Sequence, residues 1–459
     1  MKKYLITCLL CVLCFGTILC GCTPVKPLEN APTTTAQTSV YGSALTYDNY
    51  IYFANSYQNV DDLEKGDNKN NAENPALYRI ALTDNQITKD EDGLPTLQEK
   101  VLAKIAGYSN GFMFSSGEYI YFASPNTHLD DSLSTLFDYN SYFRVKTDGT
   151  GLTEFYSSNT TVSQQTFFKI SDEEQYLLLV DVDRDGNNKL VKIAIGENIG
   201  SAETVVSGFT NIVFAQNYTN ENDIYAYYTT ELSEQDTTYG KTGQYLNKVN
   251  ILTTEKTEKI NENQTSEITL KEVYNGNLYF VFAEKNQQVN MNSVFAKLNN
   301  TSAFSFEELT APLSNITSYT DFRIVLDEAN HLHYVLTVNS KTYCLPENDK
   351  NMANYLLMEN ATILFAYGDY IYYTTTEGIY RISVRDFSDN TQISELTSLK
   401  TDTISFDGKY IYYYANDDYS SETYYMFRSR VDIPTNHELL SVLLDEDMPT
   451  EENEEETAE

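Results

Sequence analysis

The chain of 459 residues carries 66 acidic and 31 basic side chains, which gives a formal net charge of −35. Nucleic acids and anionic lipid headgroups bind basic surfaces, so this charge excludes both as partners of the folded surface and favours cationic ligands or solubility alone. The 38 Tyr and 22 Phe residues favour β-strands, and 41% hydrophobic residues suffice for a sizeable core.

The first 22 residues have the features of a bacterial lipoprotein signal peptide. Lys2 and Lys3 precede a short apolar run, residues 4–19, which is too short for a membrane-spanning helix. The run ends in Leu19-Cys20-Gly21-Cys22, which resembles a lipobox, with Cys20 as a departure from the usual small residue. The resemblance implies that Cys22 is acylated and becomes the new N-terminus. An ordinary cleaved signal or an uncleaved anchor is the alternative.

Residues 23–43 are predicted to form a disordered tether. They contain Pro24, Pro27, Pro32 and a Thr33-Thr34-Thr35 run, with little to bury. A tether of this length averages about 25 Å from end to end. Two acyl chains on Cys22 give the doubled hydrophobic signal that stable anchoring needs. We therefore expect a lipid-anchored protein on the extracytoplasmic face of the cell membrane, with the bilayer as one partner.

A short aromatic phrase recurs along residues 44–444. It reads Tyr370-Ile371-Tyr372-Tyr373 in its clearest form, and each copy follows a turn rich in Asp, Asn or Gly. Eight copies occur, starting near Tyr50, Tyr119, Tyr176, Ile224, Leu278, Leu332, Tyr370 and Tyr410. Alternate residues of a strand face opposite sides of a sheet, so a strand that is apolar at every position must be covered on both faces.

Three further strands accompany each copy. In the seventh unit they are predicted at residues 362–365, 378–383 and 392–396, and in the first at 44–47, 77–80 and 100–102. Four antiparallel strands repeated every 40 to 70 residues are typical of β-propeller blades, which stack radially and cover each other's faces. The sequence therefore predicts an all-β fold, a single propeller of eight four-stranded blades. Units three and six are the weakest, and seven blades is the alternative.

The third-strand phrases Tyr142-Phe143-Arg144-Val145 and Ile379-Tyr380-Arg381-Ile382, together with the aromatic strands, resemble a family of uncharacterised bacterial lipoprotein propellers. These are similar in turn to the YWTD propellers of low-density-lipoprotein receptors. No Trp completes that phrase here, so the receptors' blade count and ligands do not carry over. The resemblance implies a fold and names no activity.

Three hairpin loops after the aromatic strands are long, at residues 55–76, 124–140 and 230–243. Such loops emerge on one face of a propeller, and long loops are often functional. We interpret them as a partner-binding surface, with tolerated drift in exposed loops as the equal alternative.

One loop has the pattern of a calcium ligand set. Asp181, Asp183 and Asp185 alternate before Gly186, and three such carboxylates can turn towards one hard cation. The flanking segments are predicted strands, and Lys189 and Lys192 stand where further acidic ligands are expected. A plain Asp/Gly hairpin turn is therefore the alternative to a calcium site.

Other polar clusters suggest little chemistry. His331 and His333 share one face of a strand and could bind a metal, but they occupy places where other units have Tyr370 and Tyr372. His128 lies near Asp130 and Asp131 in a long loop. Cys344 is the only cysteine after residue 22, so no intramolecular disulfide forms in the body, and a small buried hydrophobe is the simplest interpretation.

Residues 445–459 hold nine acidic side chains and are predicted to be a disordered tail. No catalytic motif appears anywhere in the chain, so no catalytic residue is assigned. The sequence favours a monomeric, membrane-anchored propeller that acts as a binding or scaffold module for a protein, peptide or glycan partner, without nucleic acid. An extracytoplasmic glycan hydrolase or lyase, with acidic residues at the central channel, is the alternative.

Overall fold

The computed structural model describes residues 42–441 except 56, 58–75, 102–107, 109–110, 130–133, 159, 184, 217–219, 234–242, 262–265, 285–292, 303, 314–318 and 417–423. The predicted signal peptide with Cys22, all but the last two residues of the predicted tether, and the predicted acidic tail lie outside this range. Most of two long hairpin loops, 55–76 and 230–243, also lies outside the described residues. The same holds for Asp130 and Asp131, which the sequence places near His128.

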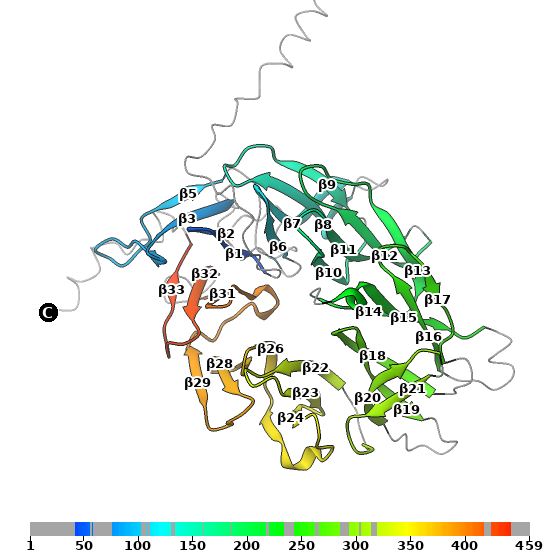
Figure 1. Cartoon of the computed structure of the whole chain (residues 1–459). Helices are drawn as coiled ribbons and strands as arrows, with labels where there is room; N and C mark the ends of the chain where they lie inside the picture. The colour runs from blue at the N-terminus through cyan, green and yellow to red at the C-terminus, as the bar shows by residue number, and fades with distance from the viewer. Residues whose placement is uncertain are drawn as a thin grey trace, which may run out of the picture.

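Eight antiparallel sheets form a ring, and each sheet is built from consecutive strands (Figure 1). This confirms the predicted eight-bladed propeller, including the two units with the weakest repeats. In every blade the first strand lies nearest the centre and the aromatic strand is second. The ring therefore places the first strands around the central channel and the fourth strands at the rim.

The first four blades run as follows, in chain order. Blade one holds β1 (Ala44–Tyr47), β2 (Tyr50–Ala54), β3 (Leu77–Thr83), β4 (Gln86–Ile87) and β5 (Gln98–Lys100); blade two holds β6 (Met113–Ser116), β7 (Tyr119–Leu129), β8 (Thr135–Lys146) and β9 (Thr153–Ser157); blade three holds β10 (Gln164–Lys169), β11 (Gln175–Val182), β12 (Asn188–Ala194) and β13 (Glu203–Phe209); and blade four holds β14 (Asn211–Phe214), β15 (Tyr225–Glu231), β16 (Gln244–Asn250) and β17 (Lys256–Thr257).

The other four blades complete the ring. Blade five holds β18 (Ser266–Tyr274), β19 (Asn277–Glu284), β20 (Ser293–Asn300) and β21 (Ser305–Glu308); blade six holds β22 (Tyr319–Leu326), β23 (Leu332–Val338), β24 (Lys341–Pro346) and β25 (Leu356–Glu359); blade seven holds β26 (Thr362–Tyr367), β27 (Tyr370–Thr375), β28 (Gly378–Ser383) and β29 (Asn390–Ser394); and blade eight holds β30 (Ser405–Phe406), β31 (Tyr410–Ala415), β32 (Tyr425–Arg430) and β33 (Glu438–Leu439).

Helix is confined, in the described ranges, to three short 3₁₀ turns: η1 (Glu221–Ile224), η2 (Met352–Asn354) and η3 (Thr401–Thr403). The described residues include no helix with the length and hydrophobicity needed to span a bilayer.

The aromatic strands are covered on both faces, as their sequence requires. In β2, Tyr52 packs into a cluster shared with blade two, while Ile51 and Phe53 pack into a cluster shared with blade eight. All three side chains are fully buried. Each aromatic strand therefore contributes to two seams, the contacts between one blade and each of its neighbours.

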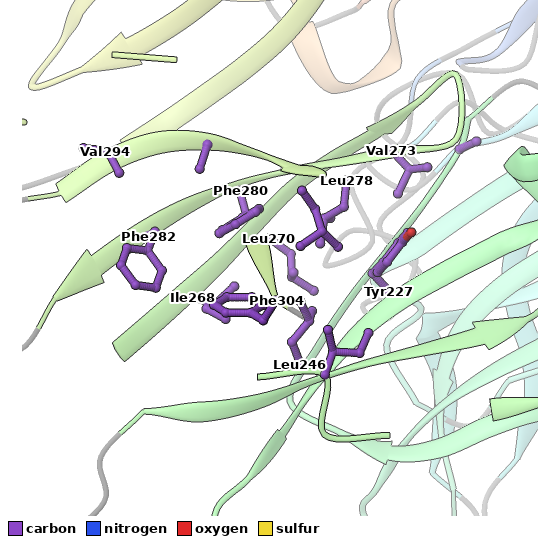
Figure 2. Close-up of a cluster of buried hydrophobic side chains, with 14 residues drawn as sticks. Tyr227, Leu246, Ile268, Leu270, Val273, Leu278, Phe280, Phe282, Val294 and Phe304 are labelled. Atoms are coloured by element: carbon purple, nitrogen blue, oxygen red, sulfur yellow. The ribbon is translucent and has the colours of Figure 1, made fainter. Parts of the chain in front are cut away.

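The seam between blades four and five shows the packing (Figure 2). Tyr227 and Leu246 from blade four meet Leu270, Leu278 and Phe280 from blade five in one cluster of 14 buried residues. Burial of apolar area of this kind contributes roughly 25 cal/mol per Å². Stability is therefore distributed around the ring, one seam after another.

The ring closes without a strand shared between the chain ends. The Ser405 hydroxyl of blade eight donates to the Ala44 carbonyl of blade one at 2.9 Å, and the Tyr414 hydroxyl donates to the Ala54 carbonyl at 2.7 Å. Apolar side chains of both blades pack around these bonds. The closing seam is thus made by side chains.

The two faces of the ring differ in what they carry. The Ala54 amide donates to the Ser43 carbonyl, so the described chain enters β1 where the hairpin after β2 leaves. At its other end, Ser441 donates to the Asn55 carbonyl at that same edge. We call this the hairpin face. The opposite turn face carries the turns between first and second strands and the connections between third and fourth strands.

Several predicted boundaries differ from the structure by a few residues, including the strand predicted at 392–396, which is β29 at Asn390–Ser394, and the largest differences lie in blades one and two. The loop predicted at residues 124–140 is largely strand, because β7 continues to Leu129 and β8 begins at Thr135. Blade one gains the short strand β4, and its outer strand β5 ends where the predicted one began. Both differences arise where polar residues extend a ladder beyond its apolar core, which an apolar pattern does not indicate.

Candidate functional site: the pocket between blades six and seven

Seven of the eight blades carry a Lys or Arg at one position of the third strand. This residue, which we call the seam cation, pairs across the sheet with the third residue of the aromatic phrase. The seam cations are Arg79, Arg144, Lys192, Lys248, Lys297, Arg381 and Arg428.

Six of these cations lie over the ring of the first tyrosine of the phrase. Distances from the charged group to the ring centroid are 4.4 Å for Arg79 over Tyr50 and 3.7 Å for Lys248 over Tyr225. Arg144, Lys192, Arg381 and Arg428 make the same contact. Such cation–π pairs contribute about 0.5–2 kcal/mol each, according to how far they are desolvated.

Some seam cations also reach the next blade. Arg144 donates to the Gly196 carbonyl at 2.5 Å, and Lys192 donates to the Leu252 carbonyl at 3.0 Å. Both carbonyls belong to the connection between the third and fourth strands of the following blade. The seam cation therefore fills the gap between one sheet and the neighbouring connection on the turn face.

Blade six departs from this arrangement. Its two-residue hairpin after Val338 matches the one after Thr375 in blade seven, which aligns Cys344 with Arg381 and Val335 with Tyr372. By the same alignment His333 takes the place of Tyr370, which corrects the sequence-based match of His331 with Tyr370 and of His333 with Tyr372. Among the described third strands, only β24 lacks the cation. A short thiol and an imidazole replace a long guanidinium and a phenol.

A cavity of about 420 Å³ lies where the long side chains are absent. His333, Cys344 and Pro346 of β23 and β24 form one side, with Asn354 and Tyr355 from the segment around η2. The other side is the connection after β28, residues 384–388, which corresponds to the connection that accepts hydrogen bonds in other seams. We call this cavity the seam pocket. It lies on the turn face.

A buried carboxylate organises the charged groups beside the pocket. Asp327 Oδ2 lies 3.3 Å from His331 Nδ1, 3.3 Å from His333 Nε2 and 3.9 Å from Arg385 Nε. The backbone N–H of His331 and these imidazoles lower the pKa of Asp327 to about 2. Arg385 Nη1 lies 3.1 Å from Asp369 Oδ2, so this guanidinium sits between carboxylates of two blades.

Cys344 lies 4.0 Å from His333 Nδ1, on the far side of the ring from Asp327. The order carboxylate, imidazole, thiol is that of a nucleophilic triad. Burial, however, raises the pKa of the Cys344 thiol to about 12, and a thiolate is the reactive form. The structure confirms the prediction that Cys344 is a small buried residue.

The histidines considered as metal ligands lie beside carboxylates in two separate places. His331 and His333 share Asp327 as a hydrogen-bond partner, with Arg385 adjacent. His128 lies 2.8 Å from Glu154 Oε1. Within the described ranges, no group of three or more His, Cys, Asp or Glu side chains is arranged to hold a metal ion.

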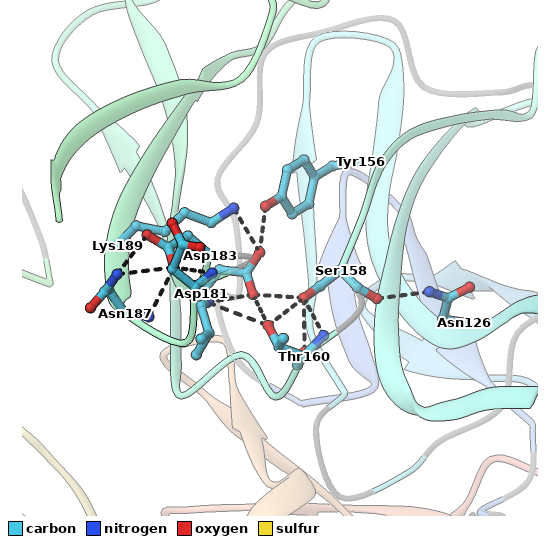
Figure 3. A network of polar contacts seen from close by, with 10 residues as sticks. Asn126, Tyr156, Ser158, Thr160, Asp181, Asp183, Asn187 and Lys189 are labelled. Carbon is cyan, nitrogen blue, oxygen red and sulfur yellow. Dashed lines mark hydrogen bonds and ion pairs between the residues drawn. The ribbon is translucent and has the colours of Figure 1, made fainter. Parts of the chain in front are cut away.

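Two of the three carboxylates of the predicted calcium loop, those of Asp181 and Asp183, point to different partners (Figure 3). Asp181 is buried and accepts hydrogen bonds from the hydroxyls of Tyr156 at 2.5 Å, Ser158 at 2.7 Å and Thr160. Asp183 accepts the backbone N–H groups of Asp185 and Asn187, both at 2.9 Å, which closes the turn. Binding of one cation by all three would require Asp181 to release its donors. The calcium site stays a prediction.

Asp181 joins blades two and three. Burial alone would raise its pKa, but hydrogen bonds from Thr160, Tyr156 and Ser158 outweigh burial and hold the pKa below its ordinary value. The carboxylate is therefore ionised and bound by donors that precede it by 21 to 25 residues.

Substitution of Asp181 by Ala is expected to destabilise the protein by about 2–3 kcal/mol, because three hydroxyl donors lose a buried acceptor. The measurement is the midpoint of urea unfolding, followed by tyrosine fluorescence. Asp183→Ala, in the same loop but only partly buried, is the control and should shift the midpoint much less. Equal shifts would show that the turn, rather than the buried network, carries the stability.

A second group of charges lies on the first strands of blades five and six. Glu272 follows a register shift in β18, and its Oε2 is buried without a hydrogen-bond partner. Burial raises the pKa of Glu272 to about 7, although Arg323 and the Ile324 N–H act in the opposite sense. Arg323 Nη2 lies 3.7 Å from Asp321 Oδ1. Arg323 therefore pairs with Asp321 and acts electrostatically on Glu272, and all three residues lie on the first strands of their blades.

Register shifts between first and second strands occur, in the described ladders, in blades five, six and seven. β-Bulges re-aim side chains and are enriched near functional sites. The irregular sector of the ring thus contains both the Glu272 group and the seam pocket.

Sequence reasoning singled out His331 and His333 but missed the pocket beside them. The sequence of the third strands contained the signal. A Lys or Arg recurs at one position in seven of them, and in blade six Cys344 occupies that position. Asp327, Arg385 and Glu272 carried no comparable signal, because acidic and basic residues are common along the whole chain and no repeated pattern marks these three.

No family model matches the chain, and no curated protein matches it. Solved structures similar to it are β-propellers. Oligogalacturonate lyase in complex with manganese is 11% identical, with a TM-score of 0.42 over 87% of this chain and 98% of that one. The propeller domain of the Trilobed protease from Pyrococcus furiosus is 8% identical, with a TM-score of 0.40 over 69% and 91%. A structure from the nidogen/laminin complex is 11% identical, with a TM-score of 0.31 over 61% and 92%. At these identities the similarity concerns the propeller fold alone.

Proposed function

We propose that the protein is a lipid-anchored, extracytoplasmic β-propeller that acts as a binding module for a protein, peptide or glycan partner. The observation that carries this proposal is the seam pocket. Seven blades carry a cation at one position of the third strand, and blade six lacks it and leaves an open cavity walled by charged and aromatic side chains. A repeat that is kept for stability alone gives no reason for such a cavity.

Exposed apolar side chains on the turn face of the same two blades support the same proposal. Leu326, Leu356, Tyr367 and Phe387 are four of the eight large hydrophobic residues that are exposed in the described chain. All four end a strand or occupy a connection on the turn face of blades six and seven. Concentration of exposed apolar side chains in one sector is typical of an interaction surface.

The test is capture of a partner from living cells with the full-length chain as bait. Two variants separate the candidate surfaces: deletion of residues 56–75 alters the hairpin face, and His333→Tyr with Cys344→Arg fills the seam pocket. Loss of the partner in the pocket variant alone is the expected result. Loss in the loop deletion alone would move the binding surface to the hairpin face. Capture of no specific partner by the unmodified chain contradicts the binding module.

Cys22→Ala is predicted to release the protein from the membrane fraction, because the acyl chains on Cys22 are the proposed hydrophobic attachment. The measurement is the distribution of the chain between membrane and soluble fractions after cell lysis. Cys20→Ala is the matched control and should leave the protein in the membrane fraction. A Cys22→Ala protein that remains with the membrane would contradict the lipobox.

A glycan-active enzyme is the second candidate, and the Glu272 group favours it. A carboxyl group with a pKa near 7, beside Arg323 and a second carboxylate, has the properties of a general acid. The test is hydrolysis or elimination of neutral and acidic oligosaccharides by the full-length chain. Turnover that disappears in Glu272→Gln would establish the enzyme, while equal turnover by both proteins, or none, would exclude this role for Glu272.

A further inference from the structure

We infer that the seam pocket binds an organic cation, an alkylammonium or guanidinium group presented by the ligand. This inference rests on the proposed binding function and specifies the chemistry of its ligand.

The first argument is the position of the pocket in the repeat. In the other blades this position of the third strand supplies a Lys or Arg side chain to the seam. Cys344 supplies none, and the cavity of about 420 Å³ far exceeds the space that a single water needs. A ligand with a charged end and a short alkyl stem has the shape of the missing side chain.

The second argument is the wall opposite Cys344. In the seams after blades two and three, the connection between third and fourth strands presents carbonyl oxygens that accept hydrogen bonds from Arg144 and Lys192. The corresponding connection of blade seven, residues 384–388, forms the wall of the seam pocket. Backbone carbonyls and a carboxylate are acceptors without donor capacity, which suits ammonium and guanidinium groups.

The third argument is the balance of charge. Asp386 lines the pocket, and Asp327 and Asp369 lie behind it. Arg385 also lines the pocket, but the carboxylates of Asp327 and Asp369 flank its guanidinium. Three carboxylates against one guanidinium leave the site formally negative. A surface of net charge −35 further raises the local concentration of cations.

The fourth argument is the aromatic lining. Tyr355 and Phe387 border the cavity from the two blades. Elsewhere in the ring an aromatic side chain receives the seam cation at 3.7–5.5 Å from its centroid. In the seam pocket, His333 has replaced the tyrosine that plays this part, and the rings of Tyr355 and Phe387 are the remaining faces for a cation.

The experiment is a calorimetric titration of the full-length chain, purified in mild detergent, with agmatine, putrescine and succinate. We expect both cations to bind, more weakly at high salt, and succinate not to bind. His333→Tyr with Cys344→Arg should abolish cation binding, because the chain's own guanidinium then occupies the pocket.

Two single substitutions test the inference even where the double variant His333→Tyr with Cys344→Arg fails to fold. Phe387→Ala is expected to weaken agmatine binding about three- to tenfold, as loss of a cation–π contact predicts. Asp386→Asn should weaken it several-fold while the amide oxygen can still close the turn to Ser388. Ile433→Ala is the matched control: Ile433 is 42% exposed and Phe387 36%, and both lie in third-to-fourth-strand connections of adjacent blades.

Absence of agmatine binding, equal binding of succinate, or equal loss in Ile433→Ala and Phe387→Ala overturns the inference. An arginine-containing peptide amide that binds more tightly than agmatine identifies a peptide side chain as the source of the cation, and equal affinity identifies a free amine. If the chain captures a partner but does not bind agmatine, the inference about the cation is wrong and the proposed binding function stands. Agmatine binding without a captured partner defeats only the macromolecular partner of the proposed function.

Discussion

Arg428→Ala is expected to lower the free energy of unfolding by about 3 kcal/mol. The guanidinium is buried in blade eight, with Nε 2.7 Å from Glu438 Oε2 and the charge 4.1 Å from the Tyr410 centroid. Removal of one partner from a buried ion pair leaves the other without compensation, and truncation to Ala also leaves a cavity. The urea midpoint measures the loss, and it should be large because blade eight forms the closing seam.

Two controls distinguish charge from packing. Arg428→Met retains most of the aliphatic volume and should recover part of the loss. Arg430→Ala, two residues further along β32, removes an exposed ion pair with Asp432 and should leave the midpoint unchanged within error. A loss for Arg430→Ala as large as that for Arg428→Ala would refute the structural role given to the seam cations.

Glu272→Gln is expected to remove a pH dependence of stability between about pH 4.5 and 7. The pKa of Glu272 is about 7 in the folded chain against an ordinary value of 4.5, so the folded state binds the extra proton in this window. Stability from this group is therefore fully present below pH 4.5 and is lost as the pH rises to 7. The difference amounts to about 2 kcal/mol, since the channel side of the carboxyl retains some solvation.

The measurement is the urea midpoint of both proteins at pH 5 and pH 8. The unmodified chain should lose more stability than Glu272→Gln over this interval. Glu267→Gln, on the same strand β18, is the control and should behave like the unmodified chain. Parallel pH profiles for the unmodified chain and Glu272→Gln would show that Glu272 has an ordinary pKa.

The fold was predictable because each blade repeats a local pattern. Continuous apolar strands such as residues 50–53 and 370–373 require cover on both faces, and a ring of blades provides it. Blades three and six were harder to recognise because Leu and Val replace the tyrosines in β11 and β23. Their packing is nonetheless equivalent: Leu178, Val335 and Leu336 are as buried as Tyr52 and Tyr372.

The candidate sites were less predictable, and for different reasons. Asp181 matches a calcium pattern in sequence, but its donors come from the end of the preceding blade, which a local pattern does not contain. The seam pocket arises from the absence of a side chain at a paired position. Aligning the third strands by their cross-strand partners identifies it, whereas reading each strand alone does not.

The separation of the two faces has a consequence for the proposed lipid attachment. The described chain enters β1 on the hairpin face, and the seam pocket opens on the turn face. Under the proposed attachment at Cys22, the segment leading to the ring would join it on the hairpin face. The seam pocket would then open on the face away from that attachment, so a ligand could approach it without passing the point of attachment.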